Sequence, residues 1–407
     1  MKKQKLCFVI PALGSGGAEK SLLSLLATLD FSRYEVDLFL LTQEPGLFFP
    51  LLRPEVNLLP IPETLKQWQR PLLHALAHFL RRGRIDLLWA RLCFSLVIFL
   101  EKKSVHAEQR AWRYYRAAIP PLTGQYDAVI GYLEKTSIYL AVDRVDAPVK
   151  IGWIHTEYNK MGMDPRLDRP YFAQLDALVS ISEQCCDTLR QTFPEQARKV
   201  RLVRNIFSTR LITTMAAEAA SFPDADFAGQ RILSIGRLTQ LKGFDLAIGA
   251  LAQLRAAGIA VRWYVIGVGP EEQRLRAQIA ARGLGDDFLL LGEYANPYPL
   301  LARADIYAQP SRYEGRSIAV DEARVLHKPI LVADFSTAAE QTTHGVDGLI
   351  VPGTVAGIAE GLRTLLTDRA LAASFTQHLA AMRHGTEEEI EKVYALLETH
   401  PAPKFQT

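Results

Sequence analysis

Short apolar runs alternate along the chain with longer stretches in which apolar residues recur every three or four positions. The first pattern is typical of strands buried on both faces, and the second of amphipathic helices. In the first half, strands are predicted at residues 6–10, 36–41, 128–130, 150–154, 177–181 and 199–203, and a helix at 21–29. This alternation predicts a parallel sheet with crossover helices.

The same pattern starts again near Gln230. Further strands are predicted at residues 231–235, 261–266, 288–290, 306–308, 329–332 and 349–351, and a helix at 244–256. A chain of 407 residues is too long for one comfortable core. We predict an N-terminal domain over residues 1–205, joined by a C-terminal helix at 384–400, and a C-terminal domain over 206–383. The polar, proline-containing segment 221–226 is interpreted as a linker.

Glycines gather after the first predicted strand, at Gly14, Gly16 and Gly17. Such a turn brings backbone N–H groups and the positive end of a helix close to an anion. Lys20 stands where a dinucleotide-binding fingerprint would have a third glycine, and no Walker lysine follows. A tight turn without any ligand therefore stays open as an alternative.

A second glycine-bounded loop follows the first strand of the second half and carries Arg237 and Lys242. Two cations five positions apart on one loop can converge on a single dianion, because arginine offers forked donors and lysine a point charge. They could stabilise a departing diphosphate without a metal. The alternative is a loop with two solvated cations.

A third motif separates Glu314 from Glu322 by seven residues, and we expect a helix to begin near Gly315. Helical spacing would place the two carboxylates at opposite ends of one elongated ligand. The backbone amides of Arg316, Ser317 and Ile318, at the helix start, would then face phosphates between them. Two ordinary helix glutamates remain the alternative.

Two other polar features receive different interpretations. His155 lies at the carboxyl end of a predicted strand, the edge where α/β sheets collect ligands, although a structural histidine fits there as well. Asp224 and Asp226 form a D-x-D pair that could hold a divalent metal, but the pair precedes a strand. We assign it to the linker and expect neither a metal nor another cofactor.

Taken in order, these motifs resemble glycosyltransferase family 4, retaining enzymes of the GT-B fold found in bacterial surface-polysaccharide synthesis. The matching patterns are Gly16–Glu19, Gly236–Gly243, Pro310–Glu322 and the later set Glu340, Gly345, Gly348, Leu349 and Val351. The resemblance implies two Rossmann-like domains whose parallel sheets face one another across a cleft. It further implies that the C-terminal domain binds a nucleotide sugar and the N-terminal domain the acceptor.

The resemblance also implies roles for single residues. Arg237 and Lys242 would hold the donor diphosphate. Glu314 would lie near the donor sugar and Glu322 on the ribose. His155 would lie beside the transferred sugar, Tyr294 near the base, and Gly16 and Gly17 near the donor phosphates or the acceptor. The usual small residue after Glu314-Gly315 is replaced by Arg316, which would place a cation near the sugar.

The distribution of charge and the cysteine content indicate where in the cell the protein works. Residues 1–205 carry 28 Lys and Arg against 21 Asp and Glu, and the excess is densest over residues 64–116. That stretch mixes cations with apolar residues, so it could lie on an anionic membrane, or equally form a buried helical layer with a solvated face. Four cysteines without metal spacing indicate a reduced, cytoplasmic protein, which the first of these alternatives would place at the inner face of the cytoplasmic membrane. The pattern matches no nucleic-acid-binding module.

The sequence therefore predicts a retaining glycosyltransferase that moves a sugar from a nucleotide diphosphate sugar, most readily a UDP-sugar. The acceptor would be a hydroxyl of a glycan or of a polyprenyl-diphosphate-linked sugar. A nucleotide-sugar epimerase, a sugar phosphorylase and a non-catalytic nucleotide-sugar-binding protein of the same fold remain alternatives. A dehydrogenase is disfavoured because neither glycine-rich turn completes the dinucleotide fingerprint.

Overall fold

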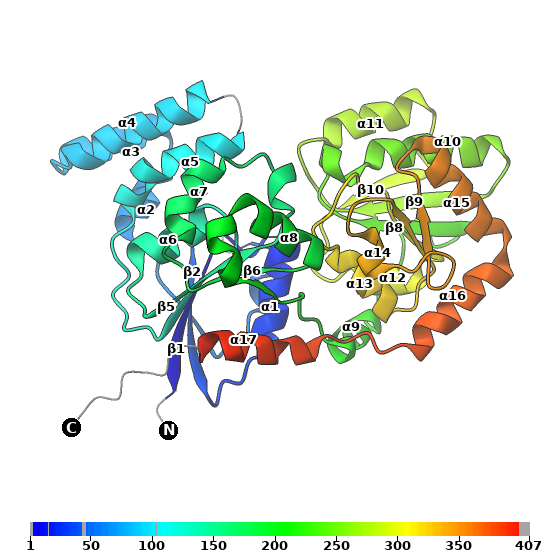
Figure 1. The fold of residues 1–407 in the computed structure, drawn as a ribbon. Coiled ribbons are helices and arrows are strands. Elements are labelled where there is room, and N and C mark those ends of the chain that lie inside the picture. Colours follow the sequence, from blue (N-terminus) through cyan, green and yellow to red (C-terminus); the bar gives the residue numbers. More distant parts are fainter. Residues whose placement is uncertain (1–2, 15, 43–45, 102–103, 399–407) are drawn as a thin grey trace. The chain divides into compact units, whose positions relative to one another are not determined.

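The computed structural model describes residues 3–14, 16–42, 46–101 and 104–398. They fold into two compact units, each built on a parallel sheet (Figure 1). The first unit holds the chain up to Ile206, apart from a short segment ending at Gly17, and the C-terminal segment from Glu388. The second unit spans Phe207–Glu387 and takes in that short segment. The chain thus passes from one unit to the other beside the boundary predicted at residue 205.

The first unit contains a seven-stranded sheet in the order β3-β2-β1-β4-β5-β6-β7. Its strands are β1 (Gln4–Ile10), β2 (Tyr34–Leu40), β3 (Val56–Leu58), β4 (Ala128–Gly131), β5 (Val149–Ile154), β6 (Ala177–Ser180) and β7 (Val200–Leu202). The sheet is buried on both faces: Leu6 and Phe8 of β1 pack into one apolar cluster, and Cys7 and Val9 into another. This explains why β1 is a continuous apolar run.

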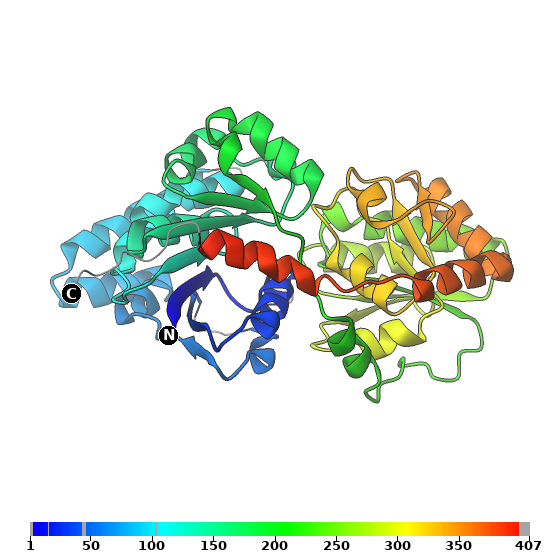
Figure 2. The ribbon, with the colours of Figure 1, turned by 60° about the horizontal axis from the view of Figure 1, so that its bottom comes forward.

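Helices cover both faces of this sheet. They are α1 (Gly17–Thr28), α2 (Glu63–Trp68), α3 (Leu72–Arg81), α4 (Ile85–Leu100), α5 (Ser104–Tyr115), α6 (Thr136–Arg144), α7 (Pro165–Phe172), α8 (Glu183–Thr192) and α17 (Ile390–Leu397). The last of these returns to the first unit (Figure 2). There the Tyr394 hydroxyl accepts a hydrogen bond from Asp30 N at 3.0 Å, and its ring stacks on that of Tyr34. The charged sequence at 386–398 is therefore helical, as predicted, from Ile390 onward.

The second unit contains a six-stranded sheet in the order β10-β9-β8-β11-β12-β13. The strands are β8 (Gln230–Ile235), β9 (Val261–Ile266), β10 (Phe288–Gly292), β11 (Ile306–Gln309), β12 (Ile330–Ala333) and β13 (Leu349–Val351). The helices are α9 (Thr209–Ala216), α10 (Phe244–Ala256), α11 (Glu272–Ala281), α12 (Tyr298–Arg303), α13 (Ile318–Val325), α14 (Ala338–Gln341), α15 (Val355–Thr367) and α16 (Arg369–Ala381).

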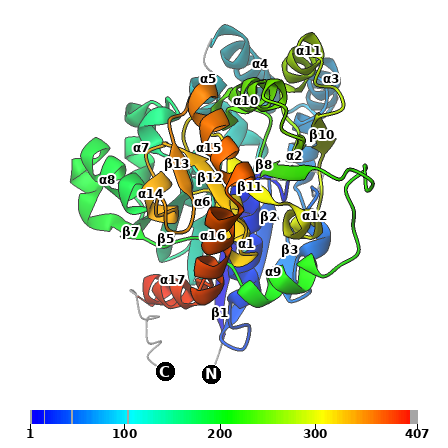
Figure 3. The same cartoon turned by 90° about the vertical axis from the view of Figure 1, so that its right-hand side faces the viewer.

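Two apolar clusters sandwich this second sheet. One joins it to α10, α11 and α15, and the other joins it to α9, α12 and α13. Figure 3 shows α10 and α15 together on one side and α9 and α12 on the other. Two Rossmann-like domains were predicted, and both are present.

The linker interpretation of residues 221–226 is wrong. Phe222 is buried in the core of the second unit, where its ring lies 4.4 Å from that of Tyr264. Asp224 Oδ2 accepts a hydrogen bond from the Tyr264 hydroxyl at 2.6 Å and forms an ion pair with Arg262. The polar residues of this segment therefore serve to attach it to β9, which sequence composition alone does not reveal.

Candidate functional site

The order of each sheet reverses next to its first strand, between β1 and β4 and between β8 and β11. At such a reversal the loops leaving the carboxyl ends of adjacent strands diverge to opposite faces, and ligands of α/β proteins bind there. In the second unit these loops are residues 236–243, after β8, and residues 310–317, after β11. They carry most of the residues that the sequence analysis singled out.

Backbone contacts hold the two loops together. Gly243 has a φ of 68°, and a Cβ at this position would lie 2.0 Å from the Pro310 carbonyl oxygen. Only glycine allows this approach. Arg312 N donates to the Leu241 carbonyl at 2.8 Å, and the Arg312 guanidinium binds both carboxylate oxygens of Asp245 at 2.8 and 2.7 Å. The loop after β8 is therefore fixed against the loop after β11.

This arrangement brings Lys242 and Glu314 into contact. Glu314 Oε1 accepts hydrogen bonds from Lys242 Nζ at 2.6 Å, from Ser311 Oγ at 2.6 Å and from Gln309 Nε2 at 2.9 Å. Oε2 accepts a second bond from Lys242 at 2.9 Å. The Glu314 side chain is 10% exposed and the Lys242 side chain 24%. A carboxylate can be buried this deeply because Lys242, Ser311 and Gln309 all donate to it.

Arg237 lies on the same loop as Lys242, and its side chain is exposed. A guanidinium in water remains available to an anionic ligand, whereas the Lys242 ammonium is already shared with a carboxylate. The two cations predicted for the diphosphate thus differ in their starting state. A ligand that engages Lys242 must compete with Glu314 or bridge to it.

Glu322 occupies a separate position on α13. It is 2% exposed, and its Oε1 accepts a hydrogen bond from the Tyr298 hydroxyl at 2.8 Å. Burial and the nearby Glu322 carboxylate raise the Tyr298 pKa well above its usual value. The helix begins at Ile318, so the prediction that it starts near Gly315 and carries both glutamates is wrong. Glu314 projects from the loop instead, which changes the spacing expected for one continuous helix.

Two of the residues that follow Glu314 already have partners in this structure. Arg316 Nε and Nη2 donate to the two oxygens of buried Asp321, each at 2.9 Å. The backbone N–H of Ser317 does not face an anion, because it donates to Gln341 Oε1 at 2.8 Å, and Gln341 Nε2 returns a bond to the Ser317 carbonyl. Ile318 remains the first residue of α13, with a half-buried side chain.

His155 follows β5 in the first unit. Its ring lies 4.9 Å from Tyr132 and 6.2 Å from Trp153, and its Nε2 is buried without a hydrogen-bond partner among the described residues. Burial lowers the His155 pKa to about 3, against a smaller opposing effect of a hydrogen bond to the Tyr132 backbone. The ring is therefore neutral near pH 7. A buried, unpaired ring nitrogen at the carboxyl edge of a sheet is a position where a ligand hydroxyl can bind.

The sequence analysis missed Glu134, which supports His155. Glu134 is 5% exposed, and its carboxylate accepts bonds from His155 N at 3.2 Å and from Thr156 Oγ1 at 3.0 Å. The next residue, Lys135, has a left-handed φ of 63°, which is unusual for a side chain with a Cβ. Gln309 is the last residue of β11, Ser311 lies two positions past it, and Glu134 lies three positions past the end of β4. A position near the carboxyl end of a strand was the available signal for all three.

The remaining predicted residues occupy the turns expected for them. Gly16 lies in the turn after β1, and Gly17 is the first residue of α1. Tyr294 follows β10 and packs, partly buried, against the apolar cluster that includes α12 and α13. Within the described part of the chain, no three His, Cys, Asp or Glu side chains are grouped as metal ligands would be.

Comparison with known proteins gives this geometry a context. Residues 226–380 match the family model described as glycosyl transferases group 1. The chain is 25% identical over 375 residues to the N-acetylgalactosamine-N,N'-diacetylbacillosaminyl-diphospho-undecaprenol 4-alpha-N-acetylgalactosaminyltransferase of Campylobacter jejuni, with 91% of this chain and 93% of that protein covered. It is 33% identical over 129 residues to the putative colanic acid biosynthesis glycosyltransferase WcaL of Salmonella typhimurium, with 30% and 32% covered.

A solved structure extends the likeness to the whole fold. The crystal structure of Anabaena Alr3699/HepE in complex with UDP-glucose has a TM-score of 0.68 at 18% sequence identity, and the match covers 97% of this chain and all of that one. The predicted GT-B fold is therefore confirmed.

Proposed function

We propose that the chain is a glycosyltransferase that transfers a sugar from a UDP-sugar with retention of the anomeric configuration. The match of residues 226–380 to the model described as glycosyl transferases group 1 and the likeness to the Campylobacter jejuni transferase support this proposal. The observation that carries the proposal is the pairing of Lys242 with Glu314 at the strand-order reversal of the second sheet. A cation beside a buried acid suits a ligand that is anionic at one end and rich in hydroxyls at the other.

Each residue of the proposed site binds a different part of the donor. Arg237 and Lys242 bind the diphosphate, and their charge offsets the negative charge that grows on it as the bond to the sugar breaks. Glu314 accepts hydrogen bonds from the sugar hydroxyls, and Glu322 from the ribose. Tyr294 lies by the base, and the Gly16–Gly17 turn approaches the phosphates or the acceptor. Ser317 and Arg316 shape the pocket from behind, through their contacts with Gln341 and Asp321.

In the reaction, the bond between the anomeric carbon and the diphosphate oxygen breaks, and a new bond forms from the acceptor hydroxyl to the same face of that carbon. The hydroxyl proton passes to the departing diphosphate, so the products are UDP and the glycoside. His155, neutral near pH 7, binds a hydroxyl of the transferred sugar through Nε2. This scheme uses the two cations where other transferases use a metal.

The proposed acceptor is a hydroxyl of a glycan carried on polyprenyl diphosphate. The diphospho-undecaprenol acceptor named for the Campylobacter jejuni relative supports this, because the match covers nearly all of both chains. The UDP-glucose bound to the Anabaena protein supports the nucleotide. The assay with single UDP-sugars identifies the sugar that is transferred.

The test incubates the purified chain with single UDP-sugars and an undecaprenyl-diphosphate-linked glycan, and measures released UDP and the mass of the lipid product. We expect UDP and an extended lipid in equal amounts. With an α-linked donor, the NMR coupling constant of the anomeric proton in the product should show an α-linkage. Conversion of one UDP-sugar into another without acceptor would indicate an epimerase. Binding of UDP without turnover of any donor would indicate a non-catalytic protein.

A further inference from the structure

Helix α4 of the first unit is far more apolar than its surroundings require. Its sixteen residues include only two charged ones, Asp86 and Arg91, and only Leu87 and Ala90 are buried. A helix that is apolar on all sides is normally enclosed by a protein core or by lipid. Here α4 packs on α3 and α5 at the outside of the unit, on the far side of α5 from the sheet (Figure 1).

Large apolar side chains are exposed along this α3–α4 hairpin, residues 72–100. On α4, Trp89 is 66% exposed, Phe99 84% and Leu100 64%, and on α3 Leu73 is 78% exposed. The exposed set also includes Leu80, Ile85, Leu96 and Ile98. More than half of the strongly exposed large apolar side chains of the described residues thus lie in one hairpin. Such a concentration marks a surface that is covered in use.

Cations flank this apolar surface. Arg81 and Arg82 are exposed at the turn between the two helices, and Arg110 and Arg113 are exposed on the neighbouring α5. Arg91, by contrast, turns inward and donates to the Trp68 carbonyl at 3.1 Å. Four exposed arginines of the 64–116 stretch therefore lie at the hairpin turn or on the helix that packs beside it.

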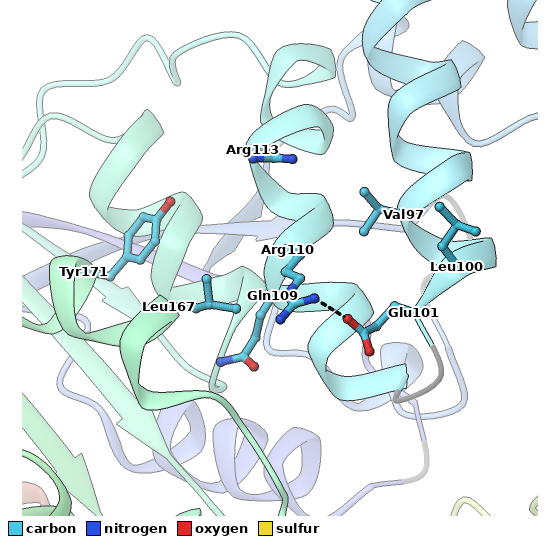
Figure 4. Close-up of a pocket in the computed structure, with 8 residues that line it drawn as sticks. All are labelled: Val97, Leu100, Glu101, Gln109, Arg110, Arg113, Leu167 and Tyr171. Carbon is cyan, nitrogen blue, oxygen red and sulfur yellow. Dashed lines mark hydrogen bonds and ion pairs between the residues drawn. The ribbon is translucent and has the colours of Figure 1, made fainter.

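A cavity of about 590 Å³ opens beside the C-terminal end of α4, between α4, α5 and α7 (Figure 4). Val97, Leu100 and Leu167 form apolar walls, and Arg110 and Arg113 supply positive charge. One Arg110 Nη atom lies 2.6 Å from a carboxylate oxygen of Glu101, whereas the Arg113 guanidinium stacks on the Tyr114 ring at 4.6 Å. Apolar walls and guanidinium groups together suit a ligand with a phosphate next to a hydrocarbon chain.

We propose that the α3–α4 hairpin docks on an anionic bilayer, with α4 lying in the plane of the interface and the cavity binding the phosphate of an anionic phospholipid. This deepens the proposed function, on which it rests, because an acceptor on polyprenyl diphosphate requires the enzyme to work at a membrane surface. Arg113 contacts the phosphate directly. Arg110 does so on leaving Glu101. Phe99 and Leu100 enter the acyl region beside the cavity.

Length and charge favour a bilayer over other occupants. A sixteen-residue helix is about 24 Å long, shorter than the roughly 30 Å hydrocarbon core, and within the described residues no helix has the length and apolarity to cross a bilayer. One lipid tail would cover only part of the hairpin. A second copy of the chain would bring Arg81, Arg82 and their equivalents together, which is unfavourable. An interfacial helix with tryptophan and flanking arginines meets none of these objections.

The experiment is flotation of the full chain with phosphatidylcholine vesicles, with and without phosphatidylglycerol. We expect strong binding only with phosphatidylglycerol. Phe99→Glu should lower the partition coefficient at least about tenfold, from the lost apolar burial, and Arg113→Gln about fivefold, from one lost cation near the surface. Leu51→Glu, which changes an exposed apolar residue of the same unit outside the hairpin, should bind as the parent does.

Several results would overturn the proposal: equal binding to neutral and anionic vesicles, unchanged binding of Phe99→Glu, or binding only when the vesicles carry polyprenyl diphosphate. A dimer that Phe99→Glu dissociates, with no flotation of the parent, would assign the surface to a second copy. Competition by glycerophosphate alone would reassign the cavity to free phosphate. UDP binding and sugar transfer, measured without vesicles in the same variants, should be unchanged, so failure of docking is distinguishable from failure of the transferase assignment.

Discussion

Replacing Glu314 by glutamine tests whether its contact with Lys242 serves the donor. Oε1 accepts three hydrogen bonds and Oε2 one, so a glutamine would best keep its oxygen at the Oε1 position. Its NH2 group would then face the Lys242 ammonium, which removes one charge-assisted bond and adds a repulsive contact. We expect unfolding free energy to fall by about 1.5–3 kcal/mol, toward the lower end because the Lys242 side chain is 24% exposed.

The effect on ligands should split in two directions. Loss of the carboxylate releases Lys242 for the diphosphate, so UDP should bind as tightly as in the parent or more tightly. Sugar transfer should fall about 10²–10³-fold, as when one charge-stabilising group is removed from a transition state. A purely structural role for Glu314 predicts instead that UDP binding and transfer weaken together.

Calorimetric titration with UDP and an initial-rate assay on the same preparation separate these cases, with chemical denaturation as the measure of stability. Lys242→Met is the companion variant, because it leaves Glu314 with its bonds from Ser311 and Gln309. It should weaken UDP binding. Unimpaired transfer by Glu314→Gln, or UDP binding unaffected by Lys242→Met, would refute the assignment of this pair to the donor.

Three further changes test other parts of the site. Gly243→Ala should destabilise the chain by at least about 1–3 kcal/mol and weaken UDP binding, because the new Cβ meets a carbonyl oxygen. The control is Gly283→Ala, because Gly283 has a φ of 64° and open space around it. In a thermal melt, this control should lose only the stability that corresponds to backbone strain. Tyr298→Phe should cost about 1–3 kcal/mol by removing the hydrogen bond from the Tyr298 hydroxyl to buried Glu322. It should also raise the donor KM, and an unchanged KM would contradict a ribose role for Glu322. In the folded chain His155 stays neutral down to about pH 3, whereas in the unfolded chain it takes up a proton near pH 6.5. Protonation of the unfolded state therefore lowers the unfolding free energy as the pH falls from about 6.5 to 3, by up to about 1.4 kcal/mol per pH unit. His155→Gln should flatten the slope in urea titrations, and an identical slope would show that His155 is not buried as a neutral ring.

Local patterns were sufficient for the elements and for the edge of the sheet where chemistry gathers. The apolar run at β1 predicted a strand buried on both faces. This prediction is confirmed, because alternate residues of β1 enter two separate apolar clusters. The same reasoning missed β3, a three-residue edge strand with only Val56 buried, because one buried side chain leaves no pattern. It also placed the start of α13 too early, because the Ser317 backbone is held by the side chain of Gln341, 24 positions away.

Two α/β domains, the loops after β8 and β11, and the types of residue on those loops could all be predicted from the sequence, because each of these depends on neighbours a few positions apart. Which of those residues are paired became visible only in the folded chain. Lys242 meets Glu314 across 72 positions, and Ser317 meets Gln341 across 24. Such pairings follow from how strands are ordered in a sheet and how buried charges find partners, and neither is encoded in local spacing.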